Sequence, residues 1–173
     1  MSAEELRARI REVPDFPKPG ILFYDITTLL KDPDAYREAI QLMLEPFQAE
    51  PPDIVVGMES RGFIFSAPMA YELKAGLVPV RKLGKLPAET LSVEYALEYG
   101  SNTLEIHRDA IEAGQKVLIV DDLLATGGTV QGTIELIERL KGLVVGLAFL
   151  VELEFLHGRE RLEGRRVESV IRY

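Results

Sequence analysis

The chain has 173 residues, of which 47% are hydrophobic and 28% charged, and its formal net charge is −8. A globular chain of this length buries roughly 70% of the surface that it exposes when unfolded. The acidic balance argues against a nucleic-acid-binding protein, and no apolar run reaches the ~18 residues that a membrane helix needs. Without cysteine the chain has neither disulfides nor thiolate metal sites. We therefore expect one globular domain, residues 1–173, that works in the cytoplasm.

Two helices are predicted near the N-terminus. Residues 1–13 alternate charged and apolar side chains at the spacing of an amphipathic surface helix. The apolar positions of this pattern are Leu6, Ile10 and Val13. A second helix should begin at Asp32, a favoured N-cap residue, and Pro33, a favoured first residue, and should end before the prolines at 51–52.

A strand, a helix and another strand follow. Residues 54–57 are apolar and predict a short buried strand, and helical spacing then begins at Arg61 and should end at Gly76. Residues 77–80 predict the next strand. This order is that of a βαβ unit, which is right-handed by default and belongs to a parallel sheet.

Residues 81–103 show no sustained period and contain Gly84, Pro87 and Gly100 among scattered polar and charged side chains. Some twenty residues without regular packing in a compact domain are typical of a functional lid or a disordered insert. The stretch begins with the cations Arg81, Lys82 and Lys85. A charge run is commonly a solvated face, but mobile cations would also close over an anionic substrate.

The second half predicts a strand at 117–120, a helix to about residue 140, a central strand at 143–151 and a final short strand at 167–173. We find no internal repeat, no linker and no second core in this pattern. The sequence therefore predicts an α/β fold, a single doubly wound, mostly parallel sheet flanked by helices, with a mobile lid loop at about 81–103.

Residues 117–129 read V-L-I-V-D-D-L-L-A-T-G-G-T, a buried strand followed by two acids and a Thr/Gly turn before a helix. Ligands bind at the carboxyl ends of strands in open α/β sheets, and a helix N-terminus preceded by glycines binds anions. Asp121 and Asp122 would repel a phosphate, so they suit ribose hydroxyls or a metal ion. Each part alone is also typical of a solvated turn, but the ordered combination favours a binding site.

Residues 59–62 read E-S-R-G and predict a second anion site, because they also join a strand to a helix. Ser60 and backbone N–H groups can donate to phosphate oxygens, and the Arg61 guanidinium can bind two of them at once. The alternative is a plain helix start, in which Ser60 caps the helix and Arg61 is solvated.

The pattern at 117–129 closely resembles the phosphoribosyl pyrophosphate (PRPP) signature of the type I phosphoribosyltransferases. Three more stretches resemble the adenine phosphoribosyltransferase family: 16–33 its N-terminal motif, 57–68 its pyrophosphate loop and 78–106 its mobile lid. The resemblance extends from about residue 14 to residue 163. It implies the reaction adenine + PRPP → AMP + pyrophosphate in purine salvage, with Mg²⁺ as cofactor, and a homodimer.

The resemblance also implies which residues bind PRPP. It places Asp121 and Asp122 on the ribose hydroxyls, with Mg²⁺ held mainly through the substrate and these two acids as its candidate ligands. The 5′-phosphate is implied to contact Ala125, Thr126, Gly127, Gly128 and Thr129. The pyrophosphate is implied to contact Glu59, Ser60, Arg61, Arg81, Lys82 and Lys85. In the family, the residue matching Arg81 reaches a site in the neighbouring subunit.

Catalytic assistance is implied for Glu98 and Tyr99, which belong to the L-E-Y-G stretch at 97–100, together with Arg61. Glu98 would share a proton with N7 of the purine while N9 attacks; without the resemblance it would read as an ordinary surface glutamate. The base is implied to bind Phe23, Tyr24 and Leu153. Leu153 could equally be a core residue.

One departure from the family keeps other functions open. Tyr24 stands where the family often has an arginine that helps to hold adenine, so another purine base, xanthine or hypoxanthine, is an alternative substrate. A PRPP-sensing regulator without turnover is a second alternative, but the L-E-Y-G stretch is intact and the chain has no appended DNA-binding module. A P-loop NTPase is excluded, because the G-x-x-x-x-G-K-[ST] pattern is absent.

Overall fold

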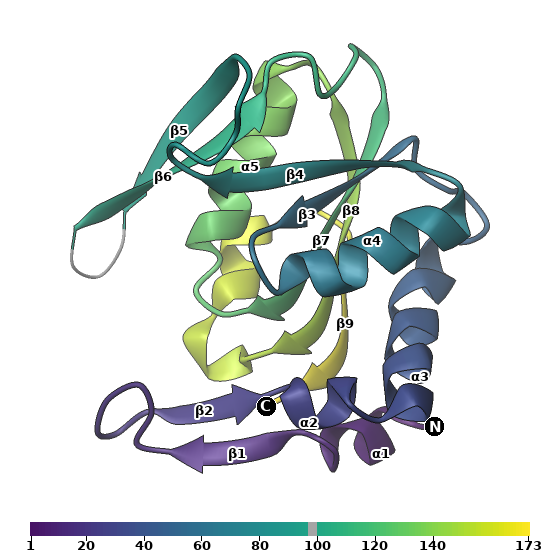
Figure 1. Cartoon of the computed structure of the whole chain (residues 1–173), viewed down its shortest axis with the longest axis vertical. Helices are drawn as coiled ribbons and strands as arrows, with labels where there is room; N and C mark the ends of the chain where they lie inside the picture. The colour runs from purple at the N-terminus through teal and green to yellow at the C-terminus, as the bar shows by residue number, and fades with distance from the viewer. Residues whose placement is uncertain (97–99) are drawn as a thin grey trace.

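The computed structural model describes residues 1–96 and 100–173 and places seven strands in one sheet, in the order β5-β6-β4-β3-β7-β8-β9 (Figure 1). The strands from β4 to β9 in this order pair in parallel, and β6 and β5 add two antiparallel strands at one edge. The predicted mostly parallel sheet is thus confirmed, and the antiparallel edge strands make it a mixed one. The strands are β3 (Ile54–Met58), β4 (Gly76–Lys82), β5 (Thr90–Ala96), β6 (Ser101–His107), β7 (Lys116–Leu124), β8 (Leu143–Glu152) and β9 (Val167–Arg172).

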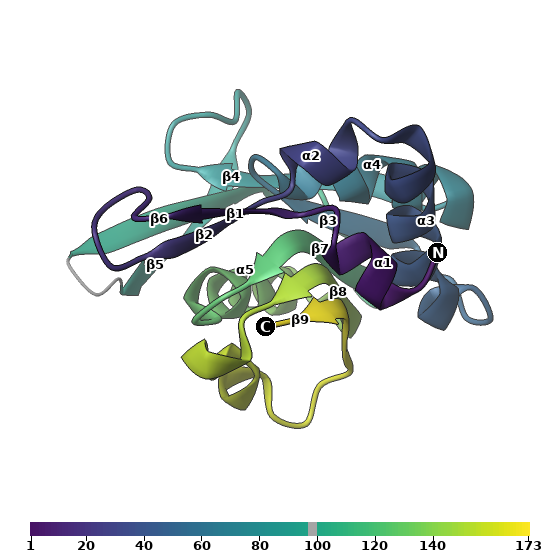
Figure 2. The same cartoon turned by 90° about the horizontal axis from the view of Figure 1, so that it is seen from below.

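Helices cover both faces of the sheet, α3 (Pro33–Leu44) and α4 (Gly62–Leu73) on one and α5 (Gly128–Arg139) on the other (Figure 2). The Asp32 carboxylate caps α3, as expected, by accepting hydrogen bonds from two backbone N–H groups of the first turn. The chain continues from α3 into a 3₁₀ turn, η1 (Glu45–Phe47). The predicted end of α4 at Gly76 was wrong: Lys74 takes the left-handed conformation (φ 55°), and Gly76 already begins β4.

The core has two parts because the central strands are buried on both faces. Along β7, Leu118 and Val120 pack toward α3 and α4, whereas Val117 and Ile119 pack toward α5. All four side chains are 0% exposed. Alternate side chains of a strand point to opposite faces, so a strand covered on both sides must be apolar at every position.

The predicted helix at 1–13 is much shorter than expected. Helix α1 (Ala3–Arg7) is followed by β1 (Arg11–Pro14), which pairs antiparallel with β2 (Leu22–Asp25), with Val13 opposite Phe23. A proline disfavours the helical conformation in the residue before it, which explains why Val13 is extended. A short helix, α2 (Thr27–Leu30), then leads to α3, and the β1–β2 hairpin lies across from the arrowheads of β7 and β8 (Figure 1).

The prediction that 81–103 lacks regular structure was also wrong. Strands β5 and β6 pair along their whole lengths as an antiparallel hairpin, and β5 packs on α5. The loop before β5 is held by the buried Glu105 carboxylate, which accepts hydrogen bonds from Gly84 N (3.0 Å) and Thr90 Oγ1 (2.9 Å). Movement of this hairpin as a lid stays a prediction. In the described part of the chain, no helix is both long and apolar enough to cross a membrane.

Candidate functional site

The two predicted anion-binding stretches meet in one cleft of about 450 Å³ at the carboxyl ends of β3 and β7. They meet because β3 and β7 are neighbours in the sheet, so the loops that follow them lie side by side. The predicted residues that line the cleft are Glu59, Ser60, Arg61, Lys82, Asp121, Asp122, Ala125 and Thr129. Tyr95 and Asn102 of the β5–β6 hairpin line it from the other side.

The two acids lie within β7 rather than after it, because β8 continues to pair with β7 as far as Leu124. Asp121 lies against the first residue of α4: a Cβ atom at Gly62 would approach Asp121 Oδ1 to 2.8 Å. Burial and the neighbouring charge of Asp122 raise the pKa of Asp121 well above its ordinary value. Asp121 therefore resists ionisation beside the charge of Asp122. A pair of acids in this state favours a cation or hydroxyl groups as its ligand.

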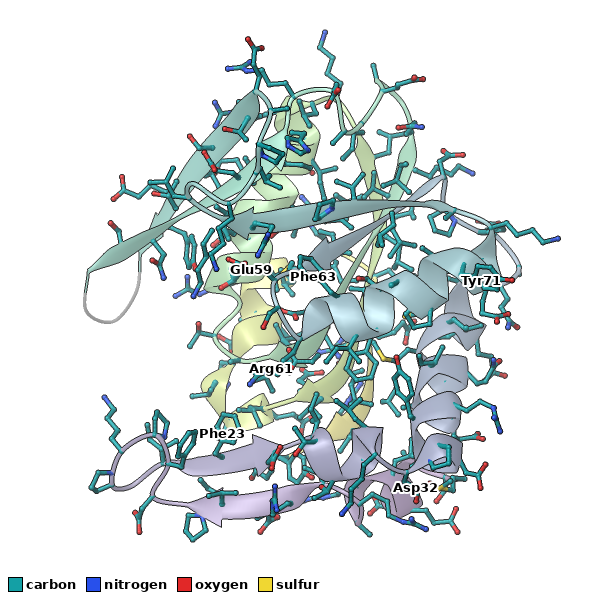
Figure 3. The ribbon with its side chains drawn as sticks, in the orientation of Figure 1. Phe23, Asp32, Glu59, Arg61, Phe63 and Tyr71 are labelled. Atoms are coloured by element: carbon teal, nitrogen blue, oxygen red, sulfur yellow. The ribbon has the colours of Figure 1, made fainter. Side chains whose placement is uncertain are left out.

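Arg61 connects the two stretches. Its Nε atom lies 2.6 Å from Oδ2 of Asp122, and its guanidinium lies 5.6 Å from the centre of the Phe23 ring. Figure 3 shows Arg61 between the loop of Glu59 and the hairpin of Phe23. The Ser60 side chain does not cap α4: the helix has no side-chain cap, and Ser60 contacts the first turn through its backbone carbonyl, which accepts from Phe63 N (3.2 Å).

Glu59 gathers the cations of the predicted lid. Its buried carboxylate accepts hydrogen bonds from Arg81 (3.1 and 3.0 Å) and from the Lys82 backbone N–H (2.8 Å), and Lys85 Nζ lies 3.4 Å away. Burial alone would raise the pKa of Glu59, but these hydrogen bonds and the Lys85 charge outweigh it and lower the pKa. In this structure Arg81 therefore binds Glu59 of its own chain.

The turn before α5 is built to expose backbone N–H groups. Gly127 takes the left-handed conformation (φ 83°) at the N-cap of α5 and offers no side-chain cap. The first N–H groups of a helix have no partner within the helix, so the N–H groups that follow Gly127 are free for an anion. Within the first turns of α5, Thr133 Oγ1 donates to the Thr129 carbonyl four residues earlier (2.9 Å).

A second, smaller cavity of about 180 Å³ lies beside the cleft and shares Arg61 and Asp122 with it. It brings together the three predicted base-binding residues, Phe23, Tyr24 and Leu153. The Tyr24 ring packs on Tyr173 at a centroid distance of 3.9 Å, and burial raises the pKa of its hydroxyl. The sequence analysis did not name the other apolar residues of its lining, Ile21, Leu22, Ile26, Leu123 and Val151.

Two predicted catalytic residues, Glu98 and Tyr99, lie outside the described residues. Among the residues that are described, no three side chains of the His, Cys, Asp and Glu types are grouped as metal ligands. Three carboxylates line the cleft, and because Arg81, Lys82 and Lys85 occupy that of Glu59, Asp121 and Asp122 are the candidate metal ligands among the described residues. Mg²⁺ commonly binds one or two carboxylates and takes its remaining ligands from water and substrate phosphates, so this pair fits it.

Comparison with known proteins agrees with this geometry. The family described as "Phosphoribosyl transferase domain" matches residues 25–170. An adenine phosphoribosyltransferase of Acetivibrio thermocellus is 58% identical over 98% of this chain and 99% of its own, and one of Desulfitobacterium hafniense is 57% identical over the whole of both chains.

Solved structures agree as well. The crystal structure of adenine phosphoribosyltransferase from Thermoanaerobacter pseudethanolicus has a TM-score of 0.96 at 52% identity, covering 99% of this chain and 100% of that one. The Saccharomyces cerevisiae enzyme, complexed with D-DIAB, an imino-altritol bisphosphate, and adenine, has a TM-score of 0.91 at 41% identity, with 97% of each chain covered. The chain therefore belongs to the adenine phosphoribosyltransferase family of type I phosphoribosyltransferases and has that family's activity in purine salvage.

Proposed function

We propose that adenine and PRPP react to AMP and pyrophosphate in the cleft between residues 59–61 and 121–129, with the base in the adjoining apolar cavity. The observation that carries this proposal is the ion pair of Arg61 and Asp122, which brings the two loops to one point beside Phe23. Two anion-binding loops, a pair of acids and an apolar cavity that adjoin one another suit a substrate with a base, a sugar and two separate phosphate groups. No side chain of these motifs has to act as a covalent nucleophile.

Asp121 and Asp122 accept hydrogen bonds from the 2′- and 3′-hydroxyls of the ribose. The free N–H groups of residues 125–129 bind the 5′-phosphate, and the hydroxyls of Thr126 and Thr129 donate to it as well. Binding energy gained at this phosphate, which does not react, positions C1′ against N9 of the base.

The leaving pyrophosphate binds Ser60, Arg61 and the cations Arg81, Lys82 and Lys85. Glu59 now holds Arg81 and Lys85 near the cleft, and a multiply charged pyrophosphate competes for the same donors. Glu59 therefore keeps Arg81 and Lys85 beside the cleft before the substrate binds. Fixed positive charge at the pyrophosphate stabilises the transition state as C1′ develops oxocarbenium character.

Together with the substrate, the oxygens of Asp121 and Asp122 would hold Mg²⁺, directly or through water. When bound, it neutralises charge on the pyrophosphate as that group leaves. The protein side chains orient the ribose. The β5–β6 hairpin excludes water that would hydrolyse PRPP.

The cavity of Phe23, Val151 and Leu153 receives adenine. Its lining is almost wholly apolar, and a flat aromatic base gains by stacking on the Phe23 ring. Glu98 follows β5 and shares a proton with N7 while N9 attacks C1′, and Tyr99 lies next to it in the chain. Tyr24 forms part of the cavity wall and, unlike the arginine that the family often has at this position, brings no charge to the base.

A second copy of the chain completes the enzyme as a homodimer. Helix α4 carries apolar residues on its outer side as well as its inner side, and a helix that is apolar all round is normally buried. Tyr71 is 82% exposed at the far end of α4 (Figure 3), and Leu77 of β4 is 47% exposed. Tyr71 and Leu77 lie at the ends of α4 and β4 that point away from the cleft, whereas Arg81 lies at the cleft end of β4. The proposed reach of Arg81 into the neighbouring site therefore rests on the family resemblance.

The test is a transfer assay with PRPP, Mg²⁺ and each of four radiolabelled bases: adenine, hypoxanthine, guanine and xanthine. Turnover of adenine alone supports the proposed base cavity and shows that Tyr24 does not spoil recognition. Turnover of hypoxanthine or xanthine instead would overturn the base assignment and leave the PRPP site in place. PRPP binding without any turnover would favour a regulator.

A further inference from the structure

A short segment after β8, which includes Gly158 and Arg159, packs against the turn of residues 125–129, to which the proposed function assigns the 5′-phosphate. Gly158 begins a 3₁₀ turn, η3 (Gly158–Leu162), and lies directly against Ala125. A Cβ atom at Gly158 would come closer to the Ala125 carbonyl oxygen than the 3.0 Å that real Cβ atoms keep, and a Cβ atom at Gly127 would lie 2.8 Å from the Gly158 carbonyl oxygen. The two backbones therefore fit together only because both positions lack a side chain.

The reason for glycine at position 158 is contact rather than conformation. Gly127 needs glycine for its left-handed φ, but Gly158 has no such φ. An alanine at position 158 could adopt the same backbone angles and would be opposed only by Ala125 and the Leu124 side chain. A substitution there must therefore push the segment and the phosphate turn apart.

The next residue, Arg159, ties this segment to β8. Its guanidinium donates to both carboxylate oxygens of Glu152, Nε to Oε1 at 2.9 Å and Nη2 to Oε2 at 2.6 Å. It also donates to the Val167 carbonyl and to Ser169 Oγ of β9. Glu152 is 3% exposed, so its charge depends on these partners. The hydrogen bonds from Arg159 and Ser169 lower the pKa of Glu152 despite its burial.

Neighbouring arginines are held differently. Arg165 pairs with Glu138 and Arg166 with Glu168, and both of these glutamates are exposed or half-exposed. Such surface pairs contribute little to position or stability. Arg159 instead forms a bidentate pair with a buried carboxylate, which fixes direction as well as distance.

We propose that Gly158 and Arg159 are positioning residues for PRPP and AMP, because Arg159, fastened to Glu152, presses Gly158 against Ala125 and so sets the place of the 5′-phosphate turn. Glu152 stands between Val151 and Leu153, two residues of the base cavity. The carboxyl end of β8 thus positions the base, through Val151 and Leu153, and the 5′-phosphate, through Glu152 and Arg159. This inference rests on the assignment of residues 125–129 to the 5′-phosphate.

The experiment compares the affinities for AMP and adenosine, which differ by the 5′-phosphate alone. Calorimetric titration would be done on the wild-type chain and on Gly158→Ala, Arg159→Met and Arg159→Lys. We expect Gly158→Ala and Arg159→Met to weaken AMP binding by about tenfold, the equivalent of one charge-assisted hydrogen bond. Adenosine affinity should be almost unchanged, and the KM for PRPP should rise while the KM for adenine stays the same.

Arg159→Lys keeps the charge but loses the planar fork, so its AMP-to-adenosine ratio should lie between those of the wild type and Arg159→Met. Arg165→Met is the matched control, a nearby arginine on a surface pair, and should leave the ratio unchanged. The lysine variant also keeps the test valid if Gly158→Ala does not fold.

Two outcomes would overturn the inference, and they differ. If the variants lose thermal stability but keep the wild-type ratio, Gly158 and Arg159 only hold the fold together. If the wild-type chain itself binds AMP no better than adenosine, residues 125–129 do not bind the 5′-phosphate, and the proposed site fails with the inference.

Discussion

The guanidinium of Arg61 and the carboxylate of Asp122 form an ion pair at 2.6 Å between the loop after β3 and strand β7. The same two side chains are assigned to different parts of PRPP, Arg61 to the pyrophosphate and Asp122 to the ribose. PRPP binding must therefore replace this contact with two others. The pair keeps both side chains at the point where the reacting C1′ atom would lie.

Substitution of Arg61 should impair PRPP binding and also lower stability. The Arg61 side chain is 45% exposed, but its partner Asp122 is 6% exposed, so the loss of Arg61 leaves a buried carboxylate without its cation. We expect Arg61→Met to raise the KM for PRPP and lower kcat, with a combined loss of about 1.5–3 kcal/mol for a charge-assisted bond. Steady-state kinetics measures both constants. Arg37→Met, which removes an exposed arginine that pairs with Asp34 on α3, should leave both unchanged.

Asp121→Asn should stabilise the protein and weaken its activity. The raised pKa of Asp121 means that the folded chain keeps a proton that the unfolded chain releases. The stability that this group contributes is therefore complete below its ordinary pKa and is lost as the pH rises through the folded pKa. Asparagine avoids this loss and can still accept the hydrogen bond from Asp122 N (2.9 Å).

The free energy of unfolding of the variant should exceed that of the wild type at pH 7, and the difference should vanish at acid pH, where Asp121 is protonated in both the folded and the unfolded chain. Thermal unfolding at several pH values measures it. A variant that is less stable than the wild type at neutral pH would show that the Asp121 charge stabilises the fold.

Thr129→Ala should raise the KM for PRPP without changing kcat greatly. In the proposed site the lost hydroxyl donates to the 5′-phosphate, a contact expected in substrate and transition state alike, and such a bond is worth about 1.5–3 kcal/mol. Thr129→Ser restores the hydroxyl and should recover most of the affinity. Equal losses in the alanine and serine variants would point to packing of the methyl group instead.

Glu98→Gln should lower kcat more than it weakens substrate binding. The prediction follows from the proposed proton shared with N7, a contact that strengthens only as the base attacks. We expect a fall in kcat of about 10²-fold or more, with nearly constant KM values. Pre-steady-state measurement of the chemical step checks the assignment, because a change in product release alone would leave that step unaltered.

Tyr71→Asp should disrupt the proposed homodimer. A charge placed at the exposed end of the apolar α4 surface would have to be buried against the second copy, which costs several kcal/mol when the charge has no partner. Sedimentation velocity should give a dimer for the wild type and a monomer for the variant. Tyr71→Phe is the control and should remain dimeric; a monomeric wild type would contradict the proposal directly.

The individual site motifs could be predicted from sequence because each is a continuous stretch at a strand end. The order of Asp121, Asp122 and the Thr-Gly-Gly-Thr turn along the chain is enough to indicate a binding site. The pairing of Arg61 with Asp122 could not be predicted from periodicity, since it depends on β3 and β7 being neighbours in the sheet. The wall residues Leu123 and Val151 were missed for a related reason: an apolar residue at the end of a buried strand looks like any other core residue.

Two elements were mispredicted although their signals were present. Leu91, Val93 and Tyr95 alternate with polar residues at the period of a strand, but Gly84 and Pro87 before them suggested irregular structure across the whole stretch. At the N-terminus, apolar positions at helical spacing outweighed Pro14, which forces Val13 out of the helical conformation. The strand period of residues 91–95 and the effect of Pro14 on Val13 determined the observed structure in these two places.

The most direct test of the central claim is a crystal structure of the protein with AMP, pyrophosphate and Mg²⁺. We expect the AMP phosphate on the backbone N–H groups of residues 126–129, the ribose hydroxyls on Asp121 and Asp122, and the pyrophosphate on Arg61. AMP bound instead in the cavity of about 690 Å³ between β5 and α5, with its phosphate on Arg139, Arg161 or Arg165, would contradict the account.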